Sequence, residues 1–417
     1  MNKGTVVIVG AGIAGLSTAY YLINDGWNVQ IIEQNTLDNN CSYGNAGMIV
    51  PSHFTPMASP GMISQGIRWM FDKKSPFYVR PSLSWNLMDW GLKFMRYANK
   101  NHVDTHAEPL RDLNVYSSKL YDTLSQDAAF DFELNQNGIM MLYKTKAVEH
   151  EEIELAKRAQ DLGLDVEIKS AAEMQALESD VEFDVLGGIL YKCDGKLNPM
   201  KLMQQLIAYL KARGAIFHEQ TCVKGYNISG KKIKEIVTDK GNFQADEFVL
   251  SPGAYLMELT NKLQLKLPLM PGKGYSFMYT PPSDVKLEHA ALLLEARVAV
   301  TPMNGKIRFG GTMELGSPNN KIYQNRVEGI VNSIPKYLTN LDVEYPKQDI
   351  WHGYRPCTPD GLPYLGRTAK YENLAIAAGA GMMGLSLGPA MGKAISDIFS
   401  NRKFETNITL FSPDRFG

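Results

Sequence analysis

Cysteine is scarce in this chain, with four residues among 417, and the four lie far apart. None of them forms the C-x-x-C pair of a zinc ribbon, and we expect neither a zinc ribbon nor a disulfide framework. A chain of this length can bury a core large enough to fold without such covalent or metal links.

An excess of charge of either sign is also missing. Lys and Arg number 43, and Asp and Glu number 44, so the net charge is −1 with neutral histidines. Proteins that bind nucleic acid usually carry a basic excess, and we therefore expect no nucleic-acid partner. Hydrophobic residues at 44% and charged residues at 21% are typical of a globular protein, and the length predicts two or three domains.

Signals for secretion or membrane insertion are weak. Apolar strand residues begin at Thr5, which leaves no room for a signal peptide, so we expect a cytoplasmic protein. One uncharged stretch, 373–392, has 20 residues and is long enough to cross a bilayer. Five glycines and a proline interrupt it. We interpret it as a buried strand at 374–378, a glycine turn and a buried helix.

A glycine motif follows the first apolar run of the chain. Residues 6–9 are β-branched, and residues 10–15 form a G-x-G-x-x-G that leads into the good helix formers of 14–24. A second apolar run at 29–32 ends at Glu33. Strand, glycine turn, helix, strand and acid in this order are the fingerprint of a dinucleotide site.

Each residue of the motif has a physical task. Gly10 permits a tight turn, Gly12 lets backbone N–H groups approach a pyrophosphate, and Gly15 lets helix and strand pack closely. The helix N-terminus adds unpaired donors and a positive partial charge. Glu33 can accept hydrogen bonds from ribose hydroxyls. The spacing alone leaves FAD and NAD as equal alternatives.

The rest of the chain predicts an alternation of helices and strands. Helical patterns cover 109–126, 149–162 and 199–213, the last with Asn198 as its N-cap, and residues 265–312 are rich in strand formers. Shorter strands are expected at 138–143, 233–238 and 248–251.

Six further segments carry a resemblance to a known family. They are 42–47 (SYGNAG), 58–61 (ASPG), 68–71 (RWMF), 273–276 (KGYS), 310–314 (GGTME) and 351–361 (WHGYRPCTPDG). In this order they resemble the D-amino-acid oxidase superfamily of FAD-dependent oxidoreductases, and within it the flavin-bearing subunits of bacterial D-amino-acid dehydrogenases. The resemblance covers nearly the whole chain.

The resemblance implies an α/β fold made of two interleaved domains. One is a Rossmann-like FAD-binding domain, and the other is an α+β substrate domain built on an antiparallel sheet. We expect the FAD-binding domain to comprise 1–60, 190–255 and 345–417. The substrate domain then comprises 61–189 and 256–344.

The resemblance also assigns the cofactor residues. The loop 42–47 would contact the pyrophosphate and flavin, Val223 would bind adenine through its backbone, and Gly253 would line the cofactor. The turn at 379–384 would point a helix N-terminus at the N1/O2 edge of the flavin, where negative charge develops on reduction. The residues expected to hold FAD are Gly10, Gly12, Ile13, Ala14, Gly15, Glu33, Gln34, Ser42, Asn45, Ala46, Gly47, Met48, Val223, Gly253, Arg355, Gly381, Met382, Met383, Gly384 and Leu385.

Three residues are expected to act on the substrate. Arg355 would bind the substrate carboxylate, because its planar guanidinium can make two parallel charge-assisted hydrogen bonds. The alternative, that Arg355 only pairs with a neighbour such as Asp360, stays open. Tyr275 is a second candidate near the carboxylate, and His352 would lie near the flavin.

Two departures from the family pattern bear on specificity and on the cofactor. Position 380, often His in similar dehydrogenases, is Ala380, and His352 stands where a small residue or Thr is common. Relatives with a covalent flavin carry Cys seven residues before the Asp of T-P-D, where this chain has Gly353. Cys357 is out of register, so we expect FAD to be bound non-covalently.

The implied reaction is oxidative deamination of an amino acid by hydride transfer from its α-carbon to flavin N5. The expected substrates are D-amino acids, of the D-proline or hydroxyproline type among them, and the electrons pass to a membrane quinone or another acceptor that is not oxygen. Two alternatives stay open. One is an oxygen-using oxidase of glycine or sarcosine type, and the other is a flavin-binding scaffold without turnover.

The segment 66–101 has seven basic and two acidic residues, and eight aromatic residues lie among them. This composition suits a peripheral contact with an anionic membrane, at the inner face of the cell membrane. It suits equally a lid whose aromatic residues are buried. His102 and His106 have a spacing that can hold zinc on a helix, but no third ligand is visible, and we expect no metal.

Overall fold

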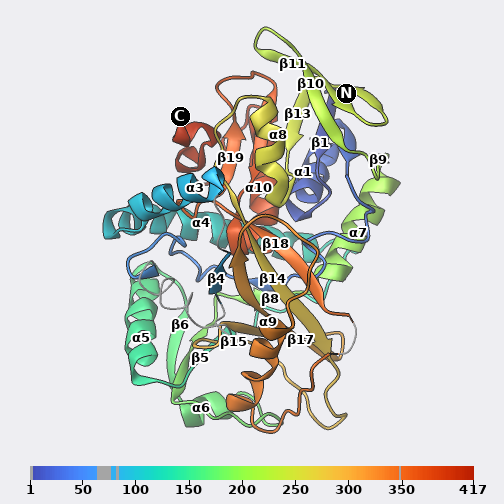
Figure 1. Cartoon of the computed structure of the whole chain (residues 1–417). Coiled ribbons are helices and arrows are strands. Elements are labelled where there is room, and N and C mark those ends of the chain that lie inside the picture. The colour runs from blue at the N-terminus through green and yellow to red at the C-terminus, as the bar shows by residue number, and fades with distance from the viewer. Residues whose placement is uncertain (1–2, 63–76, 81–83, 347–348) are drawn as a thin grey trace.

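The computed structural model describes residues 3–62, 77–80, 84–346 and 349–417 of the chain shown in Figure 1. Two large sheets organise the fold, one in the upper part of the view and one in the lower part. Strands β14 (Met270–Tyr279) and β18 (Trp351–Cys357) of the second sheet reach the centre of the molecule, where the two parts meet.

The first sheet has six strands in the order β19-β20-β13-β1-β2-β9. Its strands are parallel except for the edge strand β19, which is antiparallel to β20. Residues 6–8 of β1 are fully buried, as their β-branched run predicts for a strand covered on both faces. The strands are β1 (Thr5–Val9), β2 (Asn28–Ile32), β9 (Ile216–His218), β13 (Glu247–Leu250), β19 (Tyr364–Arg367) and β20 (Leu374–Ala378).

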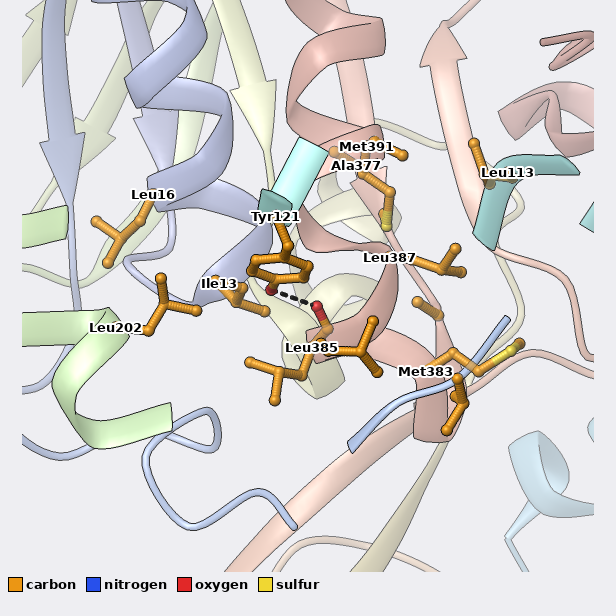
Figure 2. Close-up of a cluster of buried hydrophobic side chains, with 14 of the residues drawn as sticks. Ile13, Leu16, Leu113, Tyr121, Leu202, Ala377, Met383, Leu385, Leu387 and Met391 are labelled. Carbon is orange, nitrogen blue, oxygen red and sulfur yellow. Dashed lines mark hydrogen bonds between the residues drawn. The ribbon is translucent and has the colours of Figure 1, made fainter. Parts of the chain in front are cut away.

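Four helices pack around this sheet and against one another. They are α1 (Ile13–Asn24), α4 (Lys100–Ser125), α7 (Pro199–Ala212) and α10 (Gly384–Phe399). Helices α1 and α10 approach closely because Gly392 has no side chain: a Cβ there would lie 2.4 Å from the carbonyl carbon of Ser17. In the core that Figure 2 shows, the Tyr121 hydroxyl donates to the Leu385 carbonyl at 2.7 Å and ties α4 to α10.

The second large sheet has nine strands, in the order β18-β14-β17-β16-β15-β5-β7-β6, with β4 beside β17. Its described pairs are antiparallel except β15–β5 and β17–β4, so the sheet is mixed rather than purely antiparallel. The two parallel pairs join segments far apart in the sequence, which parallel pairing requires. The other strands are β4 (Phe77–Val79), β5 (Ile139–Tyr143), β6 (Val166–Ser170), β7 (Gly187–Tyr191), β15 (Ala290–Leu293), β16 (Val298–Met303) and β17 (Lys306–Leu315).

Smaller elements complete the described fold. Strands β10 (Val223–Ser229), β11 (Lys232–Thr238) and β12 (Gly241–Gln244) form an antiparallel sheet, and β3 (Met48–Ile49) pairs with β8 (Gly195–Lys196). The further helices are α3 (Trp85–Tyr97), α5 (Lys146–Asp161), α6 (Ala171–Gln175), α8 (Leu256–Lys262) and α9 (Gln324–Val331).

Most of the expected elements are confirmed, with the starts of two helices, α4 and α5, earlier than predicted. The helices predicted at 14–24, 149–162 and 199–213 form, and the uncharged stretch 373–392 is strand, turn and helix. Helix α4 begins at Lys100 rather than at Pro109, because Asn99 caps it by accepting a hydrogen bond from His102 N at 2.9 Å. No helix among the described residues is both long and apolar enough to cross a membrane.

The division into domains stays a prediction. Two strands of the nine-stranded sheet do not follow its boundaries. Strand β18 falls in the segment 345–417 assigned to the FAD-binding domain, and yet it pairs with β14 in the nine-stranded sheet. Strand β7 spans the expected boundary at 190 and belongs to the same sheet.

Candidate active site

A cavity of about 1400 Å³ lies where the two sheets meet. On one side it is lined by residues at the carboxyl ends of β1, β2, β13 and β20, which is where ligands bind in open parallel sheets. On the other side it is lined by β14, β17 and β18. Its volume exceeds the roughly 300–1,000 Å³ of a typical single-ligand site, so a cofactor and a substrate can share it.

The glycine turn at the end of β1 has the geometry that the fingerprint predicts. Gly10 has φ 105°, and a Cβ there would lie 2.4 Å from the carbonyl oxygen of Ser251. A Cβ on Gly15 would lie 1.9 Å from the Gly10 oxygen, so this glycine serves packing. Gly12 is the N-cap of α1, whose N-terminus faces the cavity, and Ser42 Oγ accepts from Ile13 N at 3.0 Å.

Glu33 lies buried at the edge of the cavity, directly after β2. Its carboxylate accepts hydrogen bonds from Ala11 N at 2.9 Å and Asn35 N at 3.0 Å. Both donors are backbone amides, so the carboxylate is held in place beside the glycine turn and keeps lone pairs for a ribose diol.

The turn between β20 and α10 forms a second side of the same cavity. Gly379 has φ 76° and Gly381 has φ 54°, so the chain turns sharply before α10 begins at Gly384. A Cβ added at Gly253, Gly381 or Gly384 would meet no protein atom within 4 Å, and each would point into open space. Bare backbone beside open space and two helix N-termini fit a long anionic cofactor with a flat ring.

Arg355 projects from β18 into the cavity without an acidic partner. Its Nη1 donates to the Thr312 carbonyl at 2.8 Å, and no Asp or Glu among the described residues forms an ion pair with it. The alternative partner Asp360 instead binds Arg415, with Nε–Oδ2 at 2.6 Å. Burial lowers the pKa of Arg355 from its ordinary value. A half-buried guanidinium without an acidic partner favours an anion as its ligand.

The other two expected catalytic residues lie on the opposite face of the sheet. Tyr275 of β14 pairs with His352 of β18. Arg355 lies three positions after His352 on β18, and its side chain lies on the same face of the sheet as Gly274. Because side chains alternate along a strand, Tyr275 and His352 point away from the guanidinium. Burial raises the pKa of Tyr275 and lowers that of His352, with Lys273 adding to the second shift. Both residues nevertheless line the same cavity as Arg355, and the expected place of Tyr275 near the carboxylate stays a prediction.

Most of the expected cofactor residues line the cavity, and two do not. Gly15 and Gly47 lie outside it, and a Cβ on Gly47 would lie 2.3 Å from the Leu197 oxygen, so both have packing tasks. The cavity-lining set is Gly10, Gly12, Ile13, Ala14, Glu33, Gln34, Ser42, Asn45, Ala46, Met48, Val223, Gly253, Arg355, Gly381, Met382, Met383, Gly384 and Leu385.

Sequence reasoning missed the role of Trp351 as a wall of the cavity. Its ring lies against two glycines: a Cβ would come within 2.0 Å of it at Gly44 and within 2.1 Å at Gly353. A cysteine at 353 is thus sterically excluded, and Cys357 is fully buried away from the cavity. In the sequence only Gly353, two residues after Trp351, marked this contact, because Gly44 lies near the other end of the chain.

A buried polar cluster at the cavity wall was missed as well. Asp194 accepts hydrogen bonds from Ser52 Oγ at 2.5 Å and from Ser52 N at 2.9 Å, and Ser52 Oγ lies 3.2 Å from His53 Nδ1. Burial raises the pKa of Asp194 to about 7. Burial, and then Arg297, lower the pKa of His53 to about 4. Ser52 and Asp194 are 142 positions apart, and no local pattern announces their contact.

The segment 66–101 lies partly outside the described residues, and this includes Arg68, Trp69, Lys73 and Lys74. In its described part, Trp90 is buried and donates to the Cys357 carbonyl at 2.9 Å, whereas Trp85 is exposed. His102 Nε2 lies 2.8 Å from the Asp360 carbonyl oxygen, and the described chain holds no group of three metal-ligating side chains.

Fold and site together fit a dinucleotide-binding protein whose cavity has room for a cofactor and a second ligand. Comparison with known proteins then places the chain. Residues 5–398 match the DAO family of FAD-dependent oxidoreductases, and the chain belongs to this family. It is therefore an FAD-dependent enzyme, and the glycine turn, Glu33 and the turn before α10 are the residues that fit the cofactor.

Relatives and solved structures agree with this placement. The chain is 28% identical over 412 residues to a D-amino acid dehydrogenase of Helicobacter pylori, covering 98% of each protein. It is 27% identical to a D-amino acid dehydrogenase of Granulibacter bethesdensis, covering 95% of this chain and 96% of the relative. Its fold matches glycine oxidase from Geobacillus kaustophilus with a TM-score of 0.79 at 21% identity, covering 99% and 98% of the two chains. It also matches L-proline dehydrogenase from P. horikoshii with a TM-score of 0.75 at 19% identity, covering 100% and 98%.

Proposed function

We propose that the protein catalyses oxidative deamination of small amino acids, D-amino acids foremost, and passes the electrons to a quinone or another acceptor that is not oxygen. The names of the relatives support the substrate class and the D configuration. Substrates of the D-proline and hydroxyproline type fall within the same proposal.

The observation that carries the proposal is the environment of Arg355. A half-buried guanidinium that lines the cavity and lacks an acidic partner in the described chain needs an anion, and an α-carboxylate supplies a planar one. The bound carboxylate fixes the α-carbon relative to the turn at Gly381, across the same cavity. Holding reacting atoms in one orientation can lower a barrier by several kcal/mol.

FAD supplies the acceptor for the hydride of the α-carbon. The task of the protein is then to orient the substrate and to keep water from the reacting atoms. Trp351, whose ring lies against Gly44 and Gly353, and the aliphatic residues Val50 and Leu292 line the cavity and keep part of its wall apolar.

A test of this function uses the purified holoenzyme under anaerobic conditions with a panel of D- and L-amino acids, glycine and sarcosine included. We expect D-amino acids to bleach the flavin absorbance. Arg355→Lys should retain FAD but bleach at least tenfold more slowly, because a single ammonium cannot reproduce the guanidinium fork. Arg158→Lys, which alters a surface ion pair with Asp104, is the matched control. Equal rates in Arg355→Lys and wild type would refute the carboxylate site.

The electron acceptor is tested on the reduced enzyme. Slow reoxidation by air and fast reoxidation by a soluble quinone are expected. Fast reoxidation by air with release of peroxide would favour an oxidase of glycine or sarcosine type instead. If no amino acid bleaches the flavin, the chain is a flavin-binding scaffold.

We also propose that helix α3 contacts an anionic membrane surface, from which a quinone can be reached. Four apolar side chains follow one face of α3 at helical spacing and are exposed: Trp85 by 73%, Met88 by 51%, Leu92 by 61% and Met95 by 51%. The opposite face packs into the protein through Trp90 and its neighbours.

Charge and position agree with such a contact. Arg96 and Lys100 flank the apolar stripe, whereas Asp89 is paired with Lys93. Met95 and Phe94 line the cavity, so α3 lies at its rim. An amphipathic helix with basic flanks binds anionic lipid through both buried apolar area and charge.

Co-sedimentation with vesicles tests the contact. Wild type should bind vesicles rich in anionic lipid and bind neutral vesicles more weakly. Leu92→Gln should reduce binding severalfold, whereas Ile216→Gln, which changes an equally exposed apolar residue on β9, should not. Equal vesicle binding by the two variants would contradict the membrane contact and favour the alternative that α3 is part of a lid.

A further inference from the structure

Thr312, at the wall of the cavity, has an unusual backbone conformation. Its φ is 63°, in the left-handed region that strains a β-branched residue. Among the non-glycine residues with positive φ in the described chain, Thr312 is the β-branched one. Its neighbour Gly311 could adopt such a conformation freely, yet the positive φ falls on the threonine.

The strain coincides with a bulge in β17. Lys273 of β14 pairs with Glu314, and Tyr275 pairs with Gly311, so two steps along β14 face three steps along β17. Bulges of this kind re-aim backbone groups and are common beside active sites. At this bulge the Thr312 carbonyl turns toward Arg355 and accepts from Nη1 at 2.8 Å.

The side chain of Thr312 does not explain the strain. Its hydroxyl is buried and has no hydrogen-bond partner among the described residues. The carbonyl, in contrast, engages a charged donor in the interior, where such hydrogen bonds are strong.

Among the described residues, the hydrogen bond to the Thr312 carbonyl is the contact that directs the Arg355 guanidinium. Gly274 clears the space that the guanidinium occupies, since a Cβ there would lie 2.1 Å from Nη1. A guanidinium has five N–H donors, and one is held by Thr312, so the others can face the cavity.

We propose that Thr312 is a positioning residue of the substrate site: its strained carbonyl fixes the guanidinium of Arg355 so that the free donors are aligned for a carboxylate. This inference rests on the proposed role of Arg355 as the carboxylate anchor. Backbone strain at functional sites is commonly part of such preorganisation.

Thr312→Gly separates positioning from structure. Glycine adopts the same φ without strain but holds its carbonyl less rigidly. The variant holoenzyme should therefore bind acetate about fivefold more weakly, a change of about 1 kcal/mol. Its melting temperature should at the same time rise by about 2 °C. Acetate binding is followed by the perturbation of flavin absorbance, with acetamide as the uncharged control ligand.

Two further variants keep the test decisive. Thr312→Asn, whose side chain tolerates the left-handed region, should shift affinity and melting temperature in the same directions by smaller amounts. Asn401→Gly relieves a positive φ of 52° far from the cavity, so it should raise stability without changing acetate affinity.

A purely structural role predicts that affinity and stability fall together. Unchanged acetate affinity in Thr312→Gly, or a loss of affinity with a loss of stability, would overturn the proposal.

Arg355→Lys separates a failure of the proposed function from a failure of the positioning role of Thr312. If Arg355→Lys leaves acetate binding unchanged, the proposed function fails. If it weakens binding and Thr312→Gly does not, only the positioning role fails. If both are correct, adding Thr312→Gly to Arg355→Lys should have no further effect, because the guanidinium that it positions is gone.

Discussion

Stability should depend on pH through Asp194 and His53, which both contact Ser52, and the two residues should act in opposite directions. Burial raises the pKa of Asp194 from 3.8 to about 7. Between these values the folded state holds a proton that the unfolded state has lost, so the free energy of unfolding falls as pH rises. From about pH 5 to about pH 8 this loss is about 3 kcal/mol, at 1.36 kcal/mol for each pKa unit.

His53 has the opposite sign. Its pKa is lowered from 6.5 to about 4, so in this range the unfolded state binds a proton that the folded state does not. Stability therefore rises with pH, by about 2 kcal/mol between about pH 5 and about pH 8. In the wild type the two contributions largely offset each other.

Single variants reveal each contribution. Asp194→Asn should make the protein more stable relative to wild type at about pH 8 than at about pH 5, by about 3 kcal/mol. His53→Gln should instead steepen the fall of stability with pH. Unfolding by denaturant, at fixed FAD concentration and ionic strength, measures both. Asp161→Asn, on an exposed residue, is the control for the loss of one carboxylate.

The result that would refute the reasoning is an Asp194→Asn profile parallel to that of wild type. Such a profile would mean that Asp194 is ionised throughout the range, so that its hydrogen bonds from Ser52 outweigh burial.

Three other variants test the glycine contacts and the FAD contact of the site. Gly15→Ala should destabilise the fold by about 3 kcal/mol or more in denaturant unfolding, because its Cβ would lie 1.9 Å from the Gly10 oxygen. Gly91→Ala, where a Cβ meets nothing within 4 Å in α3, should instead be neutral or stabilising by up to about 1 kcal/mol. Glu33→Ala should weaken FAD binding about tenfold in equilibrium dialysis, through loss of the ribose contact and of the acceptor for Ala11 N.

The nucleotide half of the site could be predicted from the sequence because its information is local. The tight turn, the helix N-terminus and the acid lie within residues 10–33, and the contact that requires Gly15, with the Gly10 oxygen, lies inside that unit as well. The same holds for the strand, turn and helix at 374–399. Asn198 and its following proline likewise marked the start of α7 correctly.

Features that depend on distant pairing could not be predicted. The contact of Asp194 with Ser52 joins residues 142 positions apart, and the partner of Arg415 is Asp360, a competitor considered for Arg355. The mixed character of the nine-stranded sheet also follows from pairings such as β15 with β5. In each case the sequence shows which residue types are present but not which residues they contact in the fold.

The register of strand pairing decides on which face of a sheet each residue of a motif lies. The segment 351–357 is an example. His352 and Arg355 are three positions apart, so alternation puts them on opposite faces, and pairing with β14 places Tyr275 with His352. The face of Arg355 is kept open by glycines, because Gly274 makes room for the guanidinium and Gly353 for the ring of Trp351. The opposite face is filled by large side chains, with Tyr275 almost fully buried. A motif that groups all these residues in sequence thus divides between two faces of the sheet, and the glycines mark the face that gives Arg355 and Trp351 room.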